Sequence, residues 1–251
     1  MKQYLLIIFL IVPYAAFTQG TTDSIFNAAN KQYTEDKYDN AIQLYQTIRS
    51  KGYESVELYY NIGNAYYKLK QYPKAILNYE KALSLDPANI NVKYNLAKAR
   101  IYIIDRIDEI PEFIIKRWSY RVITSISSNS WAIITIVVFL LSLALFLVYF
   151  LSMHLSIKKA AFYIGLLTVF FTVASFCFSY KAKSLMIKSN GAIIMTPTVT
   201  VKSTPSETGT NLFIVHEGTK VYVIGQLDSW YEIKLSDGKQ GWLMKSDIEA
   251  I

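Results

Sequence analysis

The chain is organised around two apolar runs, WAIITIVVFLLSLALFLVYFL (131–151) and AAFYIGLLTVFFTVASFCFSY (160–180). Neither run contains a charged side chain, and the short basic loop 152–159 separates them. A helix satisfies its own backbone hydrogen bonds, and about 20 apolar residues match the hydrocarbon thickness of a bilayer. The pattern predicts a transmembrane hairpin whose outer ends leave the membrane on one side. The alternative is a pair of buried helices in the core of a soluble domain.

Residues 1–19 have the layout of a secretory signal peptide. Lys2 precedes the apolar run Tyr4–Val12, and small residues follow before Gln19. This layout predicts export, with either cleavage near Gln19 or retention as an uncleaved anchor. Export would place both soluble parts outside the cytoplasm and the loop of the hairpin inside. In a bacterium this means an inner-membrane protein with both soluble parts in the periplasm.

Residues 22–107 repeat with a period of 34. The period relates four pairs of small or aromatic residues: Ala41 and Ala75, Tyr33 and Tyr67, Tyr38 and Tyr72, Tyr45 and Tyr79. The second copy reads NIGNAYYKLKQYPKAILNYEKALSLDP (61–87), in which small Gly63 would let two helices approach closely. Paired helices with this period are the signature of tetratricopeptide (TPR) repeats, so an all-α solenoid is expected.

The third copy is incomplete, because no second helix with the repeat pattern follows its first helix. We expect 90–107 to be a helix that caps the open end of the stack, as solenoids require. Residues 108–130 are expected to form an amphipathic juxtamembrane linker. Its apolar residues would rest in the membrane interface and its basic residues among the headgroups.

Residues 190–251 change to short runs rich in Val, Ile, Tyr and Trp, separated by Gly, Pro and Asp. Five strands are expected, at 192–195, 199–202, 220–224, 230–235 and 241–244. Within WYEIKLSDGKQGWL (230–243), Gly238 would supply the positive φ of a hairpin turn. The pattern predicts a small all-β barrel.

The inner face of the first helix of each repeat is the expected partner-binding groove. The 34-residue offset assigns to it Asn30, Tyr33, Tyr60, Asn64, Tyr67 and Lys98. Asn can hydrogen-bond both backbone groups of an extended peptide, and Tyr offers apolar area with one polar tip. The alternative is that Asn64 and Tyr67 are ordinary solvated residues and that Tyr60 packs within the stack.

Three aromatic residues of the β region, Trp230, Tyr231 and Trp242, are candidates for a second recognition face. Rings of this kind hold peptides in proline-recognising barrels. The alternative is that Trp230 and Trp242 complete a core that is too small to close without them.

Composition argues against several function classes. The net charge of +7 is spread along the chain, so no basic stripe indicates nucleic-acid binding. The chain has one cysteine, Cys177, and two histidines far apart in sequence, so we expect no metal site, no cofactor and no catalysis. The acidic run Asp105, Asp108, Glu109 and Glu112 is interpreted as a solvated helix face.

The pieces VTVKSTPSETGTNLFIVHEGTKVYVI (199–224) and WYEIKLSDGKQGWL resemble a bacterial SH3 domain. Together with the signal sequence, the repeats, the connection PEFIIKRW (111–118) and the hairpin, the whole chain resembles the BatE family of the Bacteroides aerotolerance (Bat) operon. The resemblance implies a periplasmic scaffold in aerotolerance or stress resistance. Its implied partners are von Willebrand A-domain membrane proteins and a MoxR-type ATPase of the same operon.

The sequence thus predicts a multi-domain membrane protein that acts as an interaction scaffold through its repeats and its SH3-like domain. Two alternatives remain at this point. One is a cell-wall tether that binds peptidoglycan through the SH3-like domain, and the other is a sensor whose soluble parts face the cytoplasm.

Overall fold

The computed structural model describes residues 19–107, 114–187 and 190–251. They fall into two compact units, one ending at Glu54 and one beginning at Ser55, and each is described by itself. The predicted signal peptide therefore lies outside the described residues, except for Gln19, the first residue of helix α1.

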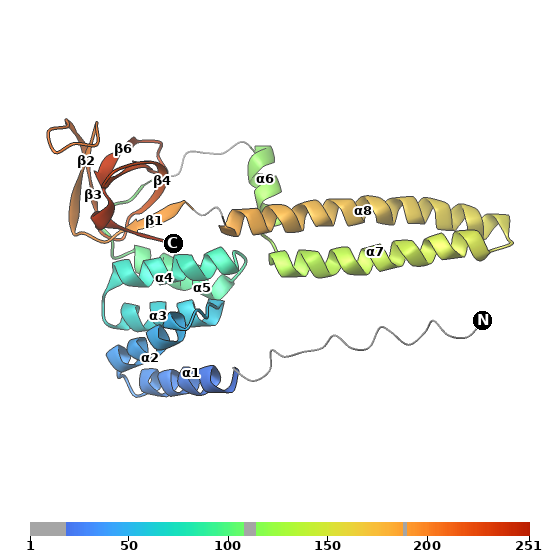
Figure 1. Ribbon diagram of the computed structural model, residues 1–251, viewed down its shortest axis with the longest axis horizontal. Coiled ribbons are helices and arrows are strands. Elements are labelled where there is room, and N and C mark those ends of the chain that lie inside the picture. Colours follow the sequence, from blue (N-terminus) through green and yellow to red (C-terminus); the bar gives the residue numbers. More distant parts are fainter. Residues whose placement is uncertain (1–18, 108–113, 188–189) are drawn as a thin grey trace. The chain divides into compact units, whose positions relative to one another are not determined.

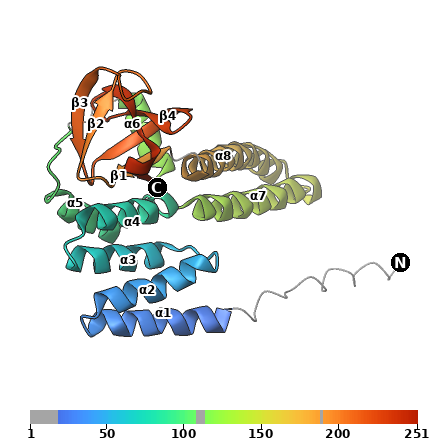
Figure 2. The same cartoon turned by 60° about the vertical axis from the view of Figure 1, so that its left-hand side comes forward.

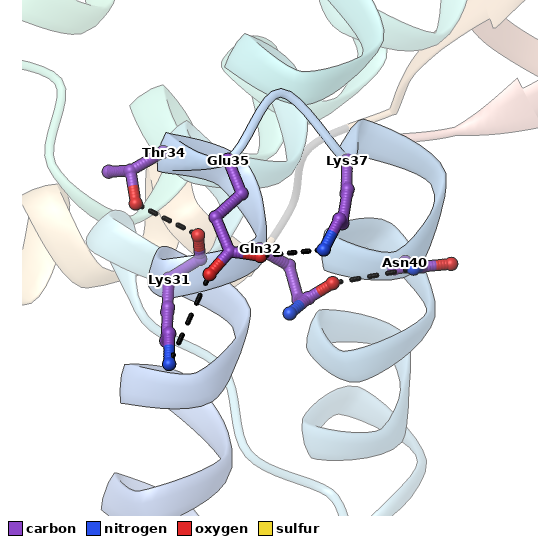
Figure 3. A network of polar contacts seen from close by, with 6 residues as sticks. All are labelled: Lys31, Gln32, Thr34, Glu35, Lys37 and Asn40. Carbon is purple, nitrogen blue, oxygen red and sulfur yellow. Dashed lines mark hydrogen bonds and ion pairs between the residues drawn. The ribbon is translucent and has the colours of Figure 1, made fainter.

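The first unit is a pair of helices, α1 (Gln19–Thr34) and α2 (Tyr38–Ser50). Exposed polar side chains surround the turn between them, as Figure 3 shows. Lys37 Nζ lies 2.8 Å from Glu35 Oε2, and Asn40 Nδ2 donates to Gln32 Oε1 at 3.3 Å. The hydrogen bond from Lys37 lowers the pKa of Glu35. Because these groups are solvated, we assign the turn network little stability.

The second unit begins with helices α3 (Val56–Lys68), α4 (Tyr72–Leu85) and α5 (Ile90–Arg100) (Figure 1). Local sequence explains where these helices begin. The Ser55 hydroxyl accepts a hydrogen bond from the Leu58 N–H at 3.1 Å, and the Asn89 side chain accepts one from Val92 at 3.2 Å, so both act as N-caps. A proline occupies the first turn of α4, where no N–H donor is needed.

The 34-residue repeat is visible in the geometry of both helix pairs. The Tyr45 hydroxyl donates to Asn30 Oδ1 at 2.5 Å, and the Tyr79 hydroxyl donates to Asn64 Oδ1 at 2.8 Å. The ring pair of Tyr33 and Tyr38 is edge-to-face at 5.3 Å, and that of Tyr67 and Tyr72 at 5.6 Å. Asp36 and Lys70, also 34 residues apart, each have a φ of 59° in the turn between the helices. The prediction of two helical repeats is confirmed.

The prediction of a capping helix over 90–107 is wrong for residues 101–107, because α5 ends at Arg100. The N–H groups of Ile101 and Tyr102 bond to the carbonyls of Lys98 and Ala99, three residues back, which tightens and ends the helix. Turns and irregular backbone follow up to Ile107. The described part of the predicted linker 108–130 contains a short helix, α6 (Ile114–Ile123).

Two long apolar helices form a hairpin, α7 (Ser128–Leu151) and α8 (Leu155–Ile187), which run side by side in Figures 1 and 2. Small polar residues lie between them: Thr135 Oγ1 donates to Ser175 Oγ at 3.0 Å, and each hydroxyl of Ser128 and Ser179 donates to the other's carbonyl. The predicted loop 152–159 is shorter than expected, because α8 already begins at Leu155. Both helices are long and apolar enough to cross a membrane, by length and composition.

Residues 190–251 form a seven-stranded antiparallel sheet with the strand order β3-β2-β6-β5-β4-β1-β7. The strands are β1 (Gly191–Ile194), β2 (Thr198–Lys202), β3 (Asn211–His216), β4 (Lys220–Leu227), β5 (Trp230–Lys234), β6 (Gln240–Met244) and β7 (Ile248–Ala250). Gly238 has a φ of 92° in the turn between β5 and β6, as its place in the predicted hairpin requires. The all-β prediction is confirmed, and the SH3-like assignment stays a prediction.

The prediction of five strands is wrong, because β3 and β7 were not expected. β3 has the sequence NLFIVH, in which the exposed residues Leu212 and Ile214 are apolar, so the sequence lacks the apolar–polar alternation of a half-buried strand. β7 has only three residues and is held by pairing with β1. The sheet core consists of aliphatic side chains from six of the strands and from Leu235: Ala192, Ile194, Val199, Val201, Val215, Val221, Ile233, Leu235 and Leu243.

Candidate functional site

The candidate site is the inner face of α3 and α5 in the second unit. Tyr60, Asn64 and Tyr67 recur on α3 at intervals of four and three residues, so they share one face of that helix. Asn95 of α5 connects this face to the next helix. Its Nδ2 group donates to the Tyr60 hydroxyl at 3.0 Å and to Asn64 Oδ1 at 2.9 Å.

Asn64 is held from two sides. Its Oδ1 atom accepts from the Tyr79 hydroxyl on α4 and from Asn95 on α5, which occupies both lone pairs of that oxygen. Within the described residues, the Asn64 Nδ2 group donates no hydrogen bond. The Asn64 side chain can therefore donate a hydrogen bond to a bound peptide, but its oxygen is not free to accept one from that peptide.

Tyr67 lies in an aromatic cluster. Its ring packs edge-to-face on Tyr72 at 5.6 Å and on Tyr102 at 6.1 Å, and the rings of Tyr72 and Tyr102 stack at 4.2 Å. Hydrogen bonding with Tyr102 raises the pKa of Tyr67. Tyr102 comes from the segment after α5, so this cluster links the turn after α5 to the second repeat.

Lys98 lies on the open part of the site, where its Nζ is 4.4 Å from the centre of the Tyr94 ring. Tyr94 is 61% exposed and Ile101 is 68% exposed, although the opposite face of the same helix buries Val92 and Leu96. The inner face of α5 thus presents aromatic and aliphatic side chains and one ammonium group to solvent.

Asn30 and Tyr33 occupy the equivalent places of the first unit. Asn30 accepts from Tyr45, and Tyr33 packs against Tyr38, as their counterparts do in the second repeat. Both side chains are half-buried. Of the six predicted groove residues, Tyr60 and Asn64 have one hydrogen-bond donor in common, Asn95.

That shared partner, Asn95, was not among the predicted groove residues. The sequence does contain a signal for it, since asparagine recurs at positions 27, 61 and 95 with the repeat period. The predicted groove positions follow Tyr60, Asn64 and Tyr67 by the 34-residue offset, and Asn95 lies one position C-terminal to the Tyr60 equivalent, Tyr94.

The three predicted aromatic residues of the sheet do not form one surface. Tyr231 pairs with Leu243 and packs against the sheet core, whereas Trp242 pairs with Glu232 on the other face. Trp230 shares that other face with Trp242 by strand alternation, and it is only 9% exposed. A cavity of about 520 Å³ lies next to Tyr231 and is bounded by the polar groups of Asn190, Gln226 and Lys245.

The interpretation of Asp105 as part of a solvated acidic face is wrong. Its carboxylate accepts from the His216 N–H at 2.7 Å and from the Thr219 hydroxyl at 2.8 Å, and His216 Nδ1 lies 2.8 Å from its other oxygen. Partial burial alone would raise the pKa of Asp105, but these contacts outweigh it and lower the pKa. The other three members of the acidic run lie outside the described residues.

Within residues 19–107, 114–187 and 190–251, no group of three or more His, Cys, Asp or Glu side chains is arranged to hold a metal ion. Residues 56–89 match the model of the tetratricopeptide repeat family. This match spans α3, α4 and the turn that follows α4. No curated protein matches the chain. The α3 part of the described site thus lies within the matched tetratricopeptide repeat.

Proposed function

We propose that this protein is a membrane-anchored scaffold that holds a partner protein along the inner face of its TPR helices. The observation that carries the proposal is the exposure of Tyr94 and Ile101 beside Lys98. Large apolar side chains on a helix whose other face is already buried are typical of an interaction surface. The site is proposed to bind and not to catalyse.

The hairpin supports the membrane part of the proposal. Most of its large apolar side chains are exposed, for example Phe150 at 63% and Phe170 at 66%, and few residues of either helix are buried. Two such helices would be insoluble in water, whereas a bilayer covers them at no cost in hydrophobic free energy.

The finer assignment is to the periplasmic face of a bacterial inner membrane, in a Bat-type complex for aerotolerance or stress resistance. Its support is the predicted signal peptide and the resemblance of the motif order to the BatE family. On this proposal the partners include von Willebrand A-domain membrane proteins and a MoxR-type ATPase. Protease added to spheroplasts should then cut both soluble parts; if both parts survive, they face the cytoplasm.

Photo-cross-linking in intact cells tests the groove. A photoreactive amino acid replacing Tyr94 should give a discrete cross-linked protein band, because this exposed side chain would contact the partner. The same amino acid replacing Lys74, which is exposed on α4, is the control and should give no such band. Equal cross-linking at both positions, or none at Tyr94, would reject the assignment.

A charge-matched pair of variants tests the same surface by affinity capture. Lys98→Glu should weaken capture of the cross-linked partner by about tenfold or more, because it reverses the charge of the exposed inner face. Lys93→Glu makes the same change on the same helix, turned about 140° around its axis, and should leave capture unchanged.

A cell-wall tether is the second candidate. The cavity beside Tyr231 and Lys245 favours it, since an aromatic ring and an ammonium group suit a sugar or an acidic wall peptide. The full-length protein in detergent should then co-sediment with purified peptidoglycan, and Tyr231→Ala should reduce the pelleted fraction. If the unaltered protein stays in the supernatant, the tether is rejected and the scaffold is unaffected.

A further inference from the structure

The apolar end of the repeat stack is covered by the β sheet. Ile193 of β1 is fully buried in one cluster with Ala75, Ile76 and Leu96 of helices α4 and α5. Met195 and Ile251, from the same sheet region, pack against this cluster. The helices precede the hairpin α7–α8 in the sequence and the sheet follows it, so this contact joins two segments that the hairpin separates along the chain.

The turn between β3 and β4 fits closely against the helical side. Gly218 has a φ of 84°, which glycine adopts without strain. A Cβ atom at this position would lie 2.5 Å from Cγ2 of Ile103 and 3.4 Å from Cδ1 of Ile76. The Gly218 backbone therefore lies so close to Ile103 and Ile76 that a side chain at position 218 would clash with Ile103.

A buried carboxylate links the same two parts. Glu80 of α4 is 6% exposed, and its two oxygens bind different partners. Arg100 of α5 lies 2.5 Å from Oε1, and Lys220 of β4 lies 2.6 Å from Oε2. A buried charge is tolerated only when it is paired, and Glu80 has one cation from the helices and one from the sheet.

A second polar link lies next to the glycine turn. Asp105 follows α5 and receives its three contacts from His216 and Thr219, and Thr219 is 2% exposed. Further along the interface, Lys81 Nζ lies 3.2 Å from Glu249 Oε1 of β7. Apolar, steric and ionic complementarity thus occur together over β1, the β3–β4 turn, the start of β4 and β7.

We propose that the β-sheet domain is the C-terminal cap of the repeat stack and takes the place of the missing second helix of the third repeat. A solenoid needs a cap because its last unit would otherwise leave an apolar face in water. Here α5 ends at Arg100, and Ile193 with its neighbours covers the face that a further helix would bury. Helices α3 to α5 and the sheet then fold as one body, and both ends of a membrane-spanning hairpin must leave the membrane on the same side.

Amide hydrogen exchange on the full-length protein in nanodiscs tests the cap. Ile193→Ala removes packing from the helical cluster, whereas Val201→Ala makes a similar truncation at an equally buried site within the sheet core. We expect Ile193→Ala to speed exchange in α4 and α5 at least tenfold, and more than Val201→Ala does. Equal or smaller effects of Ile193→Ala on these helices would overturn the proposal.

A second pair of variants keeps the test valid if the core variants do not fold. Lys220→Met and Glu80→Gln break the same ion pair from opposite sides of the interface. Each variant should speed amide exchange in α4. In the double variant, the increase in exchange rate should be smaller than the product of the two single increases. Independent, multiplicative effects would show that the contact does not couple the two parts. The cap does not depend on the proposed partner protein, because exchange is measured on the protein alone.

Discussion

Gly63→Ala is expected to destabilise the second repeat, although alanine is the better helix former. A Cβ atom at position 63 would lie 2.6 Å from Cε1 and 2.7 Å from Cδ1 of the Tyr79 ring. The ring would have to move by about 0.8 Å to reach an ordinary contact, within a close-packed cluster where Tyr79 is 1% exposed. Moving it also strains the hydrogen bond from Tyr79 to Asn64.

The magnitude follows from three terms. Overpacking costs about 1–3 kcal/mol, and weakening the part-buried hydrogen bond costs about 1–3 kcal/mol. Alanine returns about 1 kcal/mol through its higher helix propensity. The free energy of opening α3 and α4 should therefore fall by about 1–5 kcal/mol, which is about 5-fold to 4,000-fold faster amide exchange at about 1.4 kcal/mol per tenfold.

The control is the same substitution in a helix that has room for it. A Cβ atom at Gly165 in α8 would meet only Leu145 Cβ, at 3.8 Å, so Gly165→Ala should leave exchange in its helix unchanged or slower. The measurement is hydrogen exchange with mass spectrometry on the full-length protein. Unchanged or slower exchange in α3 and α4 of Gly63→Ala would refute the reasoning, because Tyr79 would then be free to move.

Three further predictions follow from single contacts. Since folding lowers the pKa of Asp105, its stabilisation is complete above the unfolded value of about 3.9 and is lost as the pH falls through the folded value. The difference in urea midpoint between the unaltered protein and Asp105→Asn should therefore shrink below about pH 4; a constant difference from pH 6 to pH 3 would contradict this. Tyr79→Phe should cost about 1–2 kcal/mol and release Asn64 for faster side-chain exchange by NMR, whereas unchanged Asn64 signals would argue against the bond. Gly238→Ala should destabilise the sheet by about 1–2 kcal/mol in thermal unfolding because of its φ of 92°, and an unchanged midpoint would show that the turn relaxes.

Much of the fold is local in origin, and those parts were predictable. The 34-residue period places Tyr45 with Asn30 and Tyr79 with Asn64, because equal spacing along two helix pairs gives equal geometry. The two apolar runs need no partner to be recognised, since length and the absence of charge are sufficient. Gly238 was likewise predictable from the chemistry of one turn.

The candidate site was predicted only in part. The face of α3 followed from helix periodicity, but periodicity does not tell which polar atoms are already paired. The sequence predicts that Asn64 offers a bound peptide both a hydrogen-bond donor and an acceptor. In the structure its oxygen already accepts hydrogen bonds from Tyr79 and Asn95. Successive residues of a strand point to opposite faces of the sheet, so Tyr231 and Trp230 of β5 cannot share one face. The sequence alone was therefore sufficient to show that the three aromatic residues do not form one surface.

The sequence by itself determined the repeats, the apolar hairpin and the β character of the last segment, because each is written in local spacing and composition. The tertiary structure alone decided that Ile193 belongs to the helical core, that Glu80 shares its charge between Arg100 and Lys220, and that Asp105 binds His216. These contacts join residues more than 90 positions apart, with the exception of the pair of Glu80 and Arg100. No periodic pattern records them, because they depend on how two finished surfaces fit together.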